Sequence, residues 1–137
     1  MMKVSDRMTS EVVTLNEEQS LRDALTLQQR HKIRHIPVVA DGNIVGILTD
    51  RDLKRASPSL LSGIDQERYD ELLDTTRVAQ VMTRDPRTVS PETSLKDVAK
   101  ILIEGKFGAL PVIEKNSLVG IITEIDLLRV LHDLLDE

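Results

Sequence analysis

Residues 46–52 read GILTDRD, and residues 120–126 read GIITEID. The two stretches share glycine, two aliphatic residues, threonine and aspartate in the same order, 74 positions apart. One copy alone can be explained as a helix-capping box, in which a threonine at the helix start pairs with an acidic residue three positions later. Two copies indicate that the chain is built from a repeated unit, and this repeat predicts the fold.

The repeat extends well beyond these seven residues. When the sequence is shifted by 74 positions, residues 4–53 align with residues 78–127 without a gap, and seventeen of the fifty pairs are identical. Two copies are too few, and their period is too long, for an open solenoid. We therefore expect two modules packed on each other. The expected boundaries are module 1 at residues 1–56, a linker with a short helix at 57–77, and module 2 at 78–137.

Each copy has the same order of local patterns. A short extended segment precedes Ser20 or Ser94, which is expected to cap a helix. Two β-runs follow, joined in the first copy by Asp41-Gly42-Asn43, residues that suit a hairpin turn. A second helix is expected to begin at Thr49 or Thr123. The order strand, helix, strand, strand, helix predicts an α+β fold.

The composition narrows the function. The 137 residues contain no cysteine, which excludes disulfides, thiolate nucleophiles and cysteine-based zinc sites. No HExxH or GxxxxGK[ST] motif is present. The net charge of −5 argues against general nucleic-acid binding, which depends on clustered basic residues. No apolar run is long enough to cross a bilayer. We therefore expect a cytoplasmic protein that is not an enzyme and that binds no metal, nucleic acid or membrane.

The repeated motifs resemble those of the cystathionine-β-synthase (CBS) domain, which usually occurs as a tandem pair. The resemblance covers almost the whole chain and rests on the MT-x-x segments, the SL-x-D helix start, the hydrophobic-Pro-Val strand and the G-h-h-T-x-x-D-L segment, where h is aliphatic. The tract RHIPVVADGNIVGILTDRDLKRASPS at residues 34–59 is similar to acetoin-utilisation protein B-like sequences in particular. The resemblance implies two β-α-β-β-α modules related by a pseudo-twofold axis in one Bateman-type unit.

The resemblance also implies a regulatory ligand and no catalytic cofactor. Adenosine derivatives such as AMP, ADP, ATP or S-adenosylmethionine would bind in clefts between the modules. Asp52 and Asp126 can each accept two hydrogen bonds from a ribose diol, as the acidic residue of a dinucleotide fold does. Thr49 and Thr123 can offer a hydroxyl group to a phosphate, beside a helix start whose unpaired N–H groups attract an anion.

The two copies differ where phosphate charge would have to be met. The first copy has Arg34 and His35 ahead of its proline, whereas the second has Gly108 and Ala109. The resemblance implies that this position faces the ligand phosphates, so Arg34 and His35 are candidates, with Arg51 and Arg55 as further helpers. Adenine needs an apolar slot. The candidates for this slot and its edges are Val12, Val13, Thr14, Ile36 and Pro37 in the first copy, and Thr88, Val89, Leu110 and Pro111 in the second.

Simpler explanations remain for each of these residues. Both Thr-x-x-Asp segments can be capping boxes only. Arg34 can be a solvated surface cation, and His35 a partly buried histidine held by a hydrogen bond. The sequence therefore leaves two functions open: a ligand sensor read by an unidentified effector protein, or a structural dimerisation module without nucleotide. The leucine-rich C-terminal segment, IDLLRVLHDLLDE, has more apolar positions than one core-facing stripe needs, which favours a homodimer.

Overall fold

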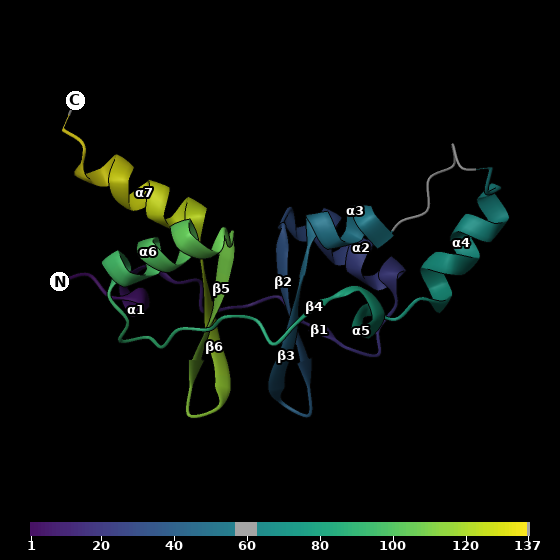
Figure 1. Cartoon of the computed structure of the whole chain (residues 1–137), viewed down its shortest axis with the longest axis horizontal. Coiled ribbons are helices and arrows are strands. Elements are labelled where there is room, and N and C mark those ends of the chain that lie inside the picture. The colour runs from purple at the N-terminus through teal and green to yellow at the C-terminus, as the bar shows by residue number, and fades with distance from the viewer. Residues whose placement is uncertain (57–62, 137) are drawn as a thin grey trace. The chain divides into compact units, whose positions relative to one another are not determined.

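The computed structural model describes residues 1–56 and 63–136, and it confirms the α+β fold (Figure 1). Helices and strands follow the predicted order in both copies of the repeat. The helices and strands are α1 (Val4–Arg7), β1 (Leu15–Asn16), α2 (Leu21–His31), β2 (His35–Ala40), β3 (Asn43–Thr49), α3 (Asp50–Ala56), α4 (Gln66–Thr75), α5 (Val78–Val81), β4 (Thr83–Arg84), α6 (Leu95–Gly105), β5 (Ala109–Glu114), β6 (Ser117–Thr123) and α7 (Glu124–Leu134).

The chain forms two compact units that divide the sequence differently from the repeat. The β2–β3 unit is Val13–Asp85, and the β5–β6 unit combines Met1–Val12 with Pro86–Glu137. The short helix that begins each copy therefore belongs to the unit formed by the rest of the other copy. Val78 of α5 is 0% exposed in the core of the β2–β3 unit, and Val4 of α1 is 0% exposed in the core of the β5–β6 unit.

The β2–β3 unit contains a four-stranded sheet in the order β1-β2-β3-β4. β1 runs parallel to β2, whereas β3 is antiparallel to both β2 and β4. The hairpin turn lies where the sequence predicted it, because Asp41 and Gly42 adopt φ values of 51° and 82°. Branched aliphatic side chains from the strands pack against α2 and α3 to form the core. The buried cluster is Leu15, Leu21, Ala24, Ile36, Val38, Leu48, Leu53, Leu73, Val78 and Met82.

The β5–β6 unit repeats this plan. The β5–β6 hairpin is extended on one side by a parallel bridge from Val89 to Val112 and on the other by an antiparallel bridge from Thr9 to Ile121. α6 is capped by Ser94 as predicted, with the Asp97 N–H 3.1 Å from Ser94 Oγ. Apolar residues spaced as one helical face cover the hairpin. The buried cluster is Val4, Val89, Leu95, Val98, Leu102, Leu110, Val112, Ile122 and Val130.

Two repeated glycines are explained by close packing within each unit. A Cβ atom on Gly46 would lie 2.5 Å from Met82 Sδ and 2.9 Å from the Thr83 carbonyl oxygen. A Cβ atom on Gly120 would lie 2.6 Å from Met8 Sδ and 2.9 Å from the Thr9 carbonyl oxygen. In each unit, the Met-Thr segment of the other copy therefore fills the space beside the glycine.

The linker helix and the short helices differ in how well the sequence predicted them. α4 forms within the expected linker and is capped by Asp65, whose Oδ1 accepts from the Arg68 N–H at 2.8 Å. Residues 57–62 of that linker lie outside the described residues. The sequence did not predict α1 and α5, because four residues are too few to show helical periodicity. The pseudo-twofold axis stays a prediction. Across residues 1–56 and 63–136, no helix is long and apolar enough to cross a membrane.

Candidate functional site

Asp52 is buried and fully engaged by its own unit. The residue is 3% exposed, and its Oδ2 accepts from the Thr49 N–H at 3.0 Å, while its own N–H donates to Thr49 Oγ1 at 3.1 Å. Arg55 Nη2 donates to Oδ1 at 2.6 Å, and Thr83 Oγ1 lies 3.4 Å and 3.3 Å from Oδ1 and Oδ2. The predicted capping box is present, and the carboxylate also holds β4 and α3 together.

Asp126 forms the same capping box with fewer additional partners. Its Oδ2 accepts from the Thr123 N–H at 2.8 Å and from Thr123 Oγ1 at 3.1 Å. The nearest charged partner of Oδ1 is Arg129 Nη1, at 3.7 Å, which is longer than a hydrogen bond. Asp126 is 8% exposed, and no buried side-chain oxygen of the described residues lacks a hydrogen bond. Oδ1 of Asp126 is therefore accessible to solvent.

The first N–H groups of the two helices are less open than the sequence suggested. The Asp50 N–H donates to the Arg34 carbonyl at 3.0 Å, and the Glu124 N–H donates to the Gly108 carbonyl at 3.0 Å. Two positions further along, the N–H of each aspartate donates to its capping threonine. The expectation of a helix start with unpaired N–H groups was wrong for these positions, because the preceding strand and the capping threonine satisfy them.

Strand pairing brings Arg34 and His35 to the capping box. His35 lies opposite Thr49 in the β2–β3 register, and the Arg34 carbonyl accepts from the first residue of α3. Arg34 is exposed and His35 is half-buried. Arg51 is also exposed, whereas the exposed guanidinium of Arg55 is committed to Asp52. The structure thus gathers the predicted phosphate candidates and the predicted ribose carboxylate at one end of the β2–β3 hairpin.

The β5–β6 unit has no cation at the equivalent place. Ala109 lies opposite Thr123 in the β5–β6 register, and Gly108 precedes it. This position therefore contributes space and no charge. The difference between the two copies that the sequence indicated is preserved in the folded units.

The predicted apolar residues divide into core and surface positions. Ile36 and Leu110 are 1% and 0% exposed and belong to the two core clusters. Both prolines that follow them are also buried. Val12, Val13, Thr14 and Thr88 are half-buried, so these four retain surface that a ligand can contact. Ile36 and Leu110 can support such a slot from behind, but their side chains face the core.

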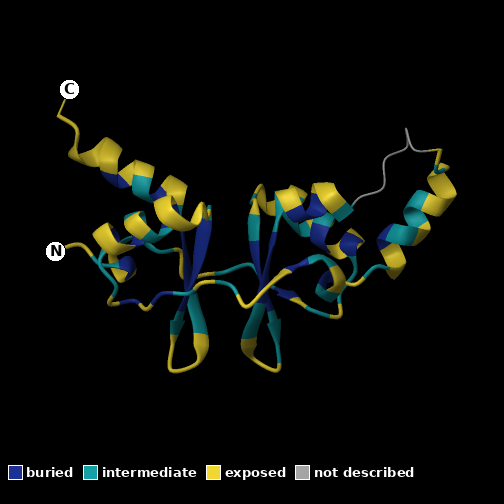
Figure 2. Cartoon of the chain, viewed as in Figure 1, coloured by how far each residue is buried: buried dark blue, intermediate teal, exposed yellow. Residues whose placement is uncertain are grey.

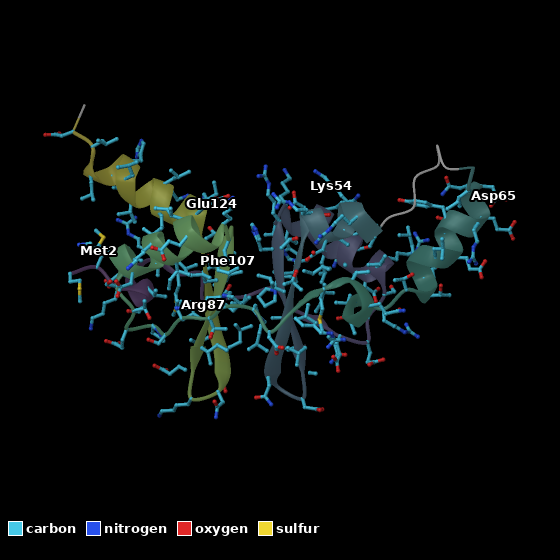
Figure 3. The ribbon with its side chains drawn as sticks, viewed as in Figure 1. Met2, Lys54, Asp65, Arg87, Phe107 and Glu124 are labelled. Carbon is cyan, nitrogen blue, oxygen red and sulfur yellow. The ribbon has the colours of Figure 1, made fainter. Side chains whose placement is uncertain are left out.

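Thr88 lines an open groove in the β5–β6 unit. The groove has a volume of about 720 Å³ and runs between residues 87–90 and the flank of α6. Its floor is apolar, with Val89, Ile101 and Ile113, and its rim carries charges of both signs. Asp126 and Thr123 do not line it, so the groove and the capping carboxylate are separate features of this unit. Arg87, which Figure 3 labels, is one of the residues that line the groove.

Sequence reasoning missed Thr83, the residue that bonds Asp52 from β4. Its signal was present, because Thr83 aligns with Thr9 in the repeat. From the sequence, the segment that contains Thr83 is interpreted only as an extended segment, and Thr83 has no predicted functional role. No group of three or more His, Cys, Asp or Glu residues that would suit a metal ion occurs in the part of the chain that the structure describes.

The CBS domain family model matches residues 4–59 and residues 78–133, the two copies of the repeat. The chain belongs to the CBS domain family. Its CBS pair is 33% identical over 127 residues to the CBS domain-containing protein YhcV of Bacillus subtilis (strain 168), and the match covers 93% of this chain and 84% of that protein. The predicted tandem CBS pair is confirmed.

Two solved structures resemble the chain over nearly its whole length. A Vibrio cholerae protein assigned as an acetoin utilization protein (AcuB) is 36% identical, with a TM-score of 0.81, and the match covers 98% of this chain and 93% of that one. CBSX2, solved in complex with AMP, is 30% identical, with a TM-score of 0.81 and 98% of each chain covered. The similarity to acetoin-utilisation protein B-like sequences is therefore confirmed as well.

Proposed function

We propose that this CBS pair is a regulatory module that binds an adenosine derivative and transmits the bound state through a change in conformation or in association with a second copy. It would catalyse no reaction of its own. The single observation that carries the proposal is the Asp126 carboxylate. Its capping box uses Oδ2, and Oδ1 remains accessible to solvent with Arg129 3.7 Å away.

A ribose diol suits such a carboxylate because the two lone pairs of the accessible Oδ1 can accept from both hydroxyl groups of the diol. Thr14 and Thr88 are half-buried, and each can offer a hydroxyl group to a ligand within its own unit. In the β2–β3 unit, Arg34 and His35 beside Thr49 provide the positive charge that a phosphate requires. A ligand with more phosphate charge would therefore prefer the Arg34 end, and a smaller or less charged ligand the Asp126 end.

AMP is the first ligand to test, because the related CBSX2 was solved in complex with AMP. ADP, ATP and S-adenosylmethionine follow from the family resemblance. A coupling between ligand and signal requires that the ligand bind one conformation more tightly than another. The regulated effector would recognise that conformation.

Thermal unfolding with each of these ligands tests the proposal. A ligand at a hundred times its dissociation constant should stabilise the folded chain by about 2.7 kcal/mol. Asp126→Asn and Asp52→Asn, made singly, keep an oxygen for the cap and remove the charge. We expect Asp126→Asn to weaken AMP binding by roughly tenfold, or about 1.4 kcal/mol. Isothermal titration that detects none of the four ligands at millimolar concentration would rule the proposal out.

The alternative function is a structural dimerisation module without nucleotide. One observation favours it: α7 carries large apolar residues on its outer side, and Figure 2 colours that side as exposed along the helix. The residues are Ile125, Leu128, Leu131 and Leu134, with Leu135 directly after the helix, each at least 50% exposed. A second copy would cover them by hydrophobic burial. Light scattering of the chain and of the Leu128→Glu variant distinguishes the two functions. The alternative is supported if the chain is a dimer, Leu128→Glu is a monomer, and none of the four ligands binds.

A further inference from the structure

The linker helix α4 covers one side of α2 in the β2–β3 unit (Figure 1). Leu73 of α4 is 4% exposed within the core cluster, and Tyr69 packs against the same cluster. Arg22 of α2 holds two acids of α4, with Nε 2.5 Å from Asp74 Oδ1 and Nη2 3.2 Å from Asp70 Oδ1. The hydrogen bond to Asp74 and then that to Asp70 raise the pKa of Arg22. Burial of Leu73 and the ion pairs of Arg22 with Asp70 and Asp74 thus hold α4 against α2.

The repeat identifies the equivalent side of α6 in the β5–β6 unit. Directly after α4, the Leu21 N–H donates to the Thr76 carbonyl at 3.0 Å. In the other unit, the Leu95 N–H donates to the Met2 carbonyl at 3.0 Å. Both donors and both acceptors are 74 positions apart, so residue 2 leads onto α6 as residue 76 leads onto α2. Met2 is labelled beside this unit in Figure 3.

The equivalent side of α6 combines exposed apolar surface with positive charge. We call it the α6 outer face and define it as Lys96, Ala99, Lys100 and Ile103. Lys96 stands where α2 has Arg22, and Lys100 and Ile103 follow at the i+4 and i+7 positions of one helical side. Both lysines are exposed, and Ile103 is 75% exposed. α7 packs against α6, but Lys96, Lys100 and Ile103 stay exposed, so among residues 1–56 and 63–136 no helix buries this face as α4 buries part of α2.

The acids of α6 lie on another side of the helix. Asp97 and Glu104 line the groove beside residues 87–90, together with one lysine, Lys100. Lys96 and Ile103 do not line that groove. Lys100 lies at the border between this groove and the outer face. The outer face itself, Lys96, Ala99, Lys100 and Ile103, therefore presents lysine and apolar side chains and contains no carboxylate.

We propose that the α6 outer face is a docking site for an acidic amphipathic helix of a partner protein. The docked helix carries two acids one turn apart beside a leucine or an aromatic residue, as α4 does. Lys96 pairs with the acids in the role that Arg22 has for α4, and Ile103 and Ala99 receive the apolar side chain. Charge complementarity sets the orientation of the helix, and burial of Ile103 provides the hydrophobic contribution.

A peptide copy of α4, residues 64–76, is the probe, and the chain offers a clean reporter. Because the sequence has no cysteine, the thiol of an Ala99→Cys variant is the only one in the protein. We expect the saturating peptide to slow the reaction of this thiol with a disulfide reagent by roughly tenfold. A matched peptide with both acids replaced, Asp70→Lys and Asp74→Lys, should give no protection. Lys96→Glu in the protein should abolish protection by the acidic peptide.

A short peptide forms little helix in water, because short isolated helices are marginally stable. A second experiment therefore attaches the α4 sequence covalently to the chain. Residues 63–75 are fused directly ahead of Met2, in place of Met1, which reproduces the connection from α4 to Thr76. The fused helix should protect the thiol of Ala99→Cys by roughly tenfold or more, and the fused helix with the two Asp→Lys changes should not.

Three results overturn the proposal. The first is an unprotected thiol in both the peptide and the fusion experiments. The second is equal protection by the acidic and the charge-reversed helices, because charge complementarity would then have no role. The third is a dimer that Lys96→Glu converts to a monomer in light scattering, because a second copy of the chain would then occupy the face. Protection by the tethered acidic helix alone supports the proposal and indicates a weak partner.

Discussion

Asp52 and Asp126 occupy one position in two copies of one motif, yet their carboxylates have different partners. Asp52 Oδ1 lies 2.6 Å from Arg55, and both of its oxygens lie within 3.4 Å of Thr83. Asp126 Oδ1 has Arg129 at 3.7 Å as its charged neighbour. Both oxygens of one carboxylate are hydrogen-bonded within the fold, while the other carboxylate has one oxygen, Oδ1, without a hydrogen bond.

The residue types do not explain this difference. Arg55 and Arg129 are 74 positions apart, and so are Thr9 and Thr83. Both units therefore contain the same arginine and the same threonine around the aspartate. The difference lies in the distances between these side chains and the aspartate, which decide whether a hydrogen bond forms. A repeated motif thus determines which hydrogen-bonding groups lie at a site. Local packing determines how many of these groups are already hydrogen-bonded within the protein.

The largest expected effect is the loss of stability when each aspartate is removed. Asp52→Ala should lower the free energy of unfolding by about 3 kcal/mol, because it removes the capping-box bond to the Thr49 N–H and the contacts with Arg55 and Thr83. Asp126→Ala should cost about 1.5 kcal/mol, since mainly the capping-box bonds to Thr123 are lost. Urea denaturation measures both. The exposed capping-box residue Asp23, changed to alanine, is the matched control and should cost least. Equal losses for the two buried aspartates would remove the contrast.

The second effect should be equal in the two units. Gly46→Ala and Gly120→Ala each place a Cβ atom less than 3.0 Å from a methionine sulfur and a backbone oxygen. Each change should therefore destabilise the chain by about 2 kcal/mol through overpacking. Gly42→Ala is a different control, because nothing lies within 4 Å of its added Cβ and its φ of 82° supplies the strain. Unequal denaturation midpoints for the first two variants would show that the Met-Thr segments pack differently.

A third prediction concerns the arginines and depends on the proposed nucleotide site. Arg55→Gln should release Asp52 Oδ1 and increase AMP affinity by roughly threefold, or about 0.7 kcal/mol. Arg129→Gln should change the affinity less, because Arg129 makes no hydrogen bond to Asp126. Isothermal titration with AMP compares the two. Weaker binding in Arg55→Gln would instead identify Arg55 as a phosphate contact, the helper role that the sequence suggested.

The smallest effect is expected at the ion pair that fastens α1 to α7. Arg7 Nη1 lies 2.9 Å from Asp133 Oδ2, and this bond, followed by that from His132, lowers the pKa of Asp133 from 3.8. A lowered carboxyl pKa stabilises the fold above the unfolded pKa, and the contribution is lost as the pH falls through the folded value. Asp133→Asn should therefore lower the thermal midpoint slightly at pH 7.

The same variant provides its own control across pH. The difference between the wild-type chain and Asp133→Asn should shrink as the pH falls below 3.8, because protonation of Asp133 then removes the same interaction. Both residues are exposed enough that salt should also reduce the difference. A difference that stays constant with pH and with salt would mean that the ion pair does not contribute.

Much of the fold was predictable from local patterns. Ser20 and Ser94 as helix caps, the Asp41-Gly42 turn and the linker helix α4 follow from short-range rules that need few residues. The candidate site was predictable in part. The Thr49-x-x-Asp52 box was correct as a cap, whereas its bonds to Thr83 and Arg55 depend on which side chains the fold brings together. The helix N–H groups at Asp50 and Glu124 were expected to be open, and the preceding strand pairs them instead.

The sequence by itself determined the order of helices and strands, the two copies and the family. The reason is that apolar periodicity, capping residues and turn residues act over a few positions and occur in both copies. Only the tertiary structure decided that Val4 completes the core built from residues 86–137 and that Val78 completes the core built from residues 13–85. A repeat cannot encode this exchange. Both short helices begin with a valine, Val4 or Val78, so each core offers either helix burial for the same side chain, and the path of the connecting chain selects which one it receives.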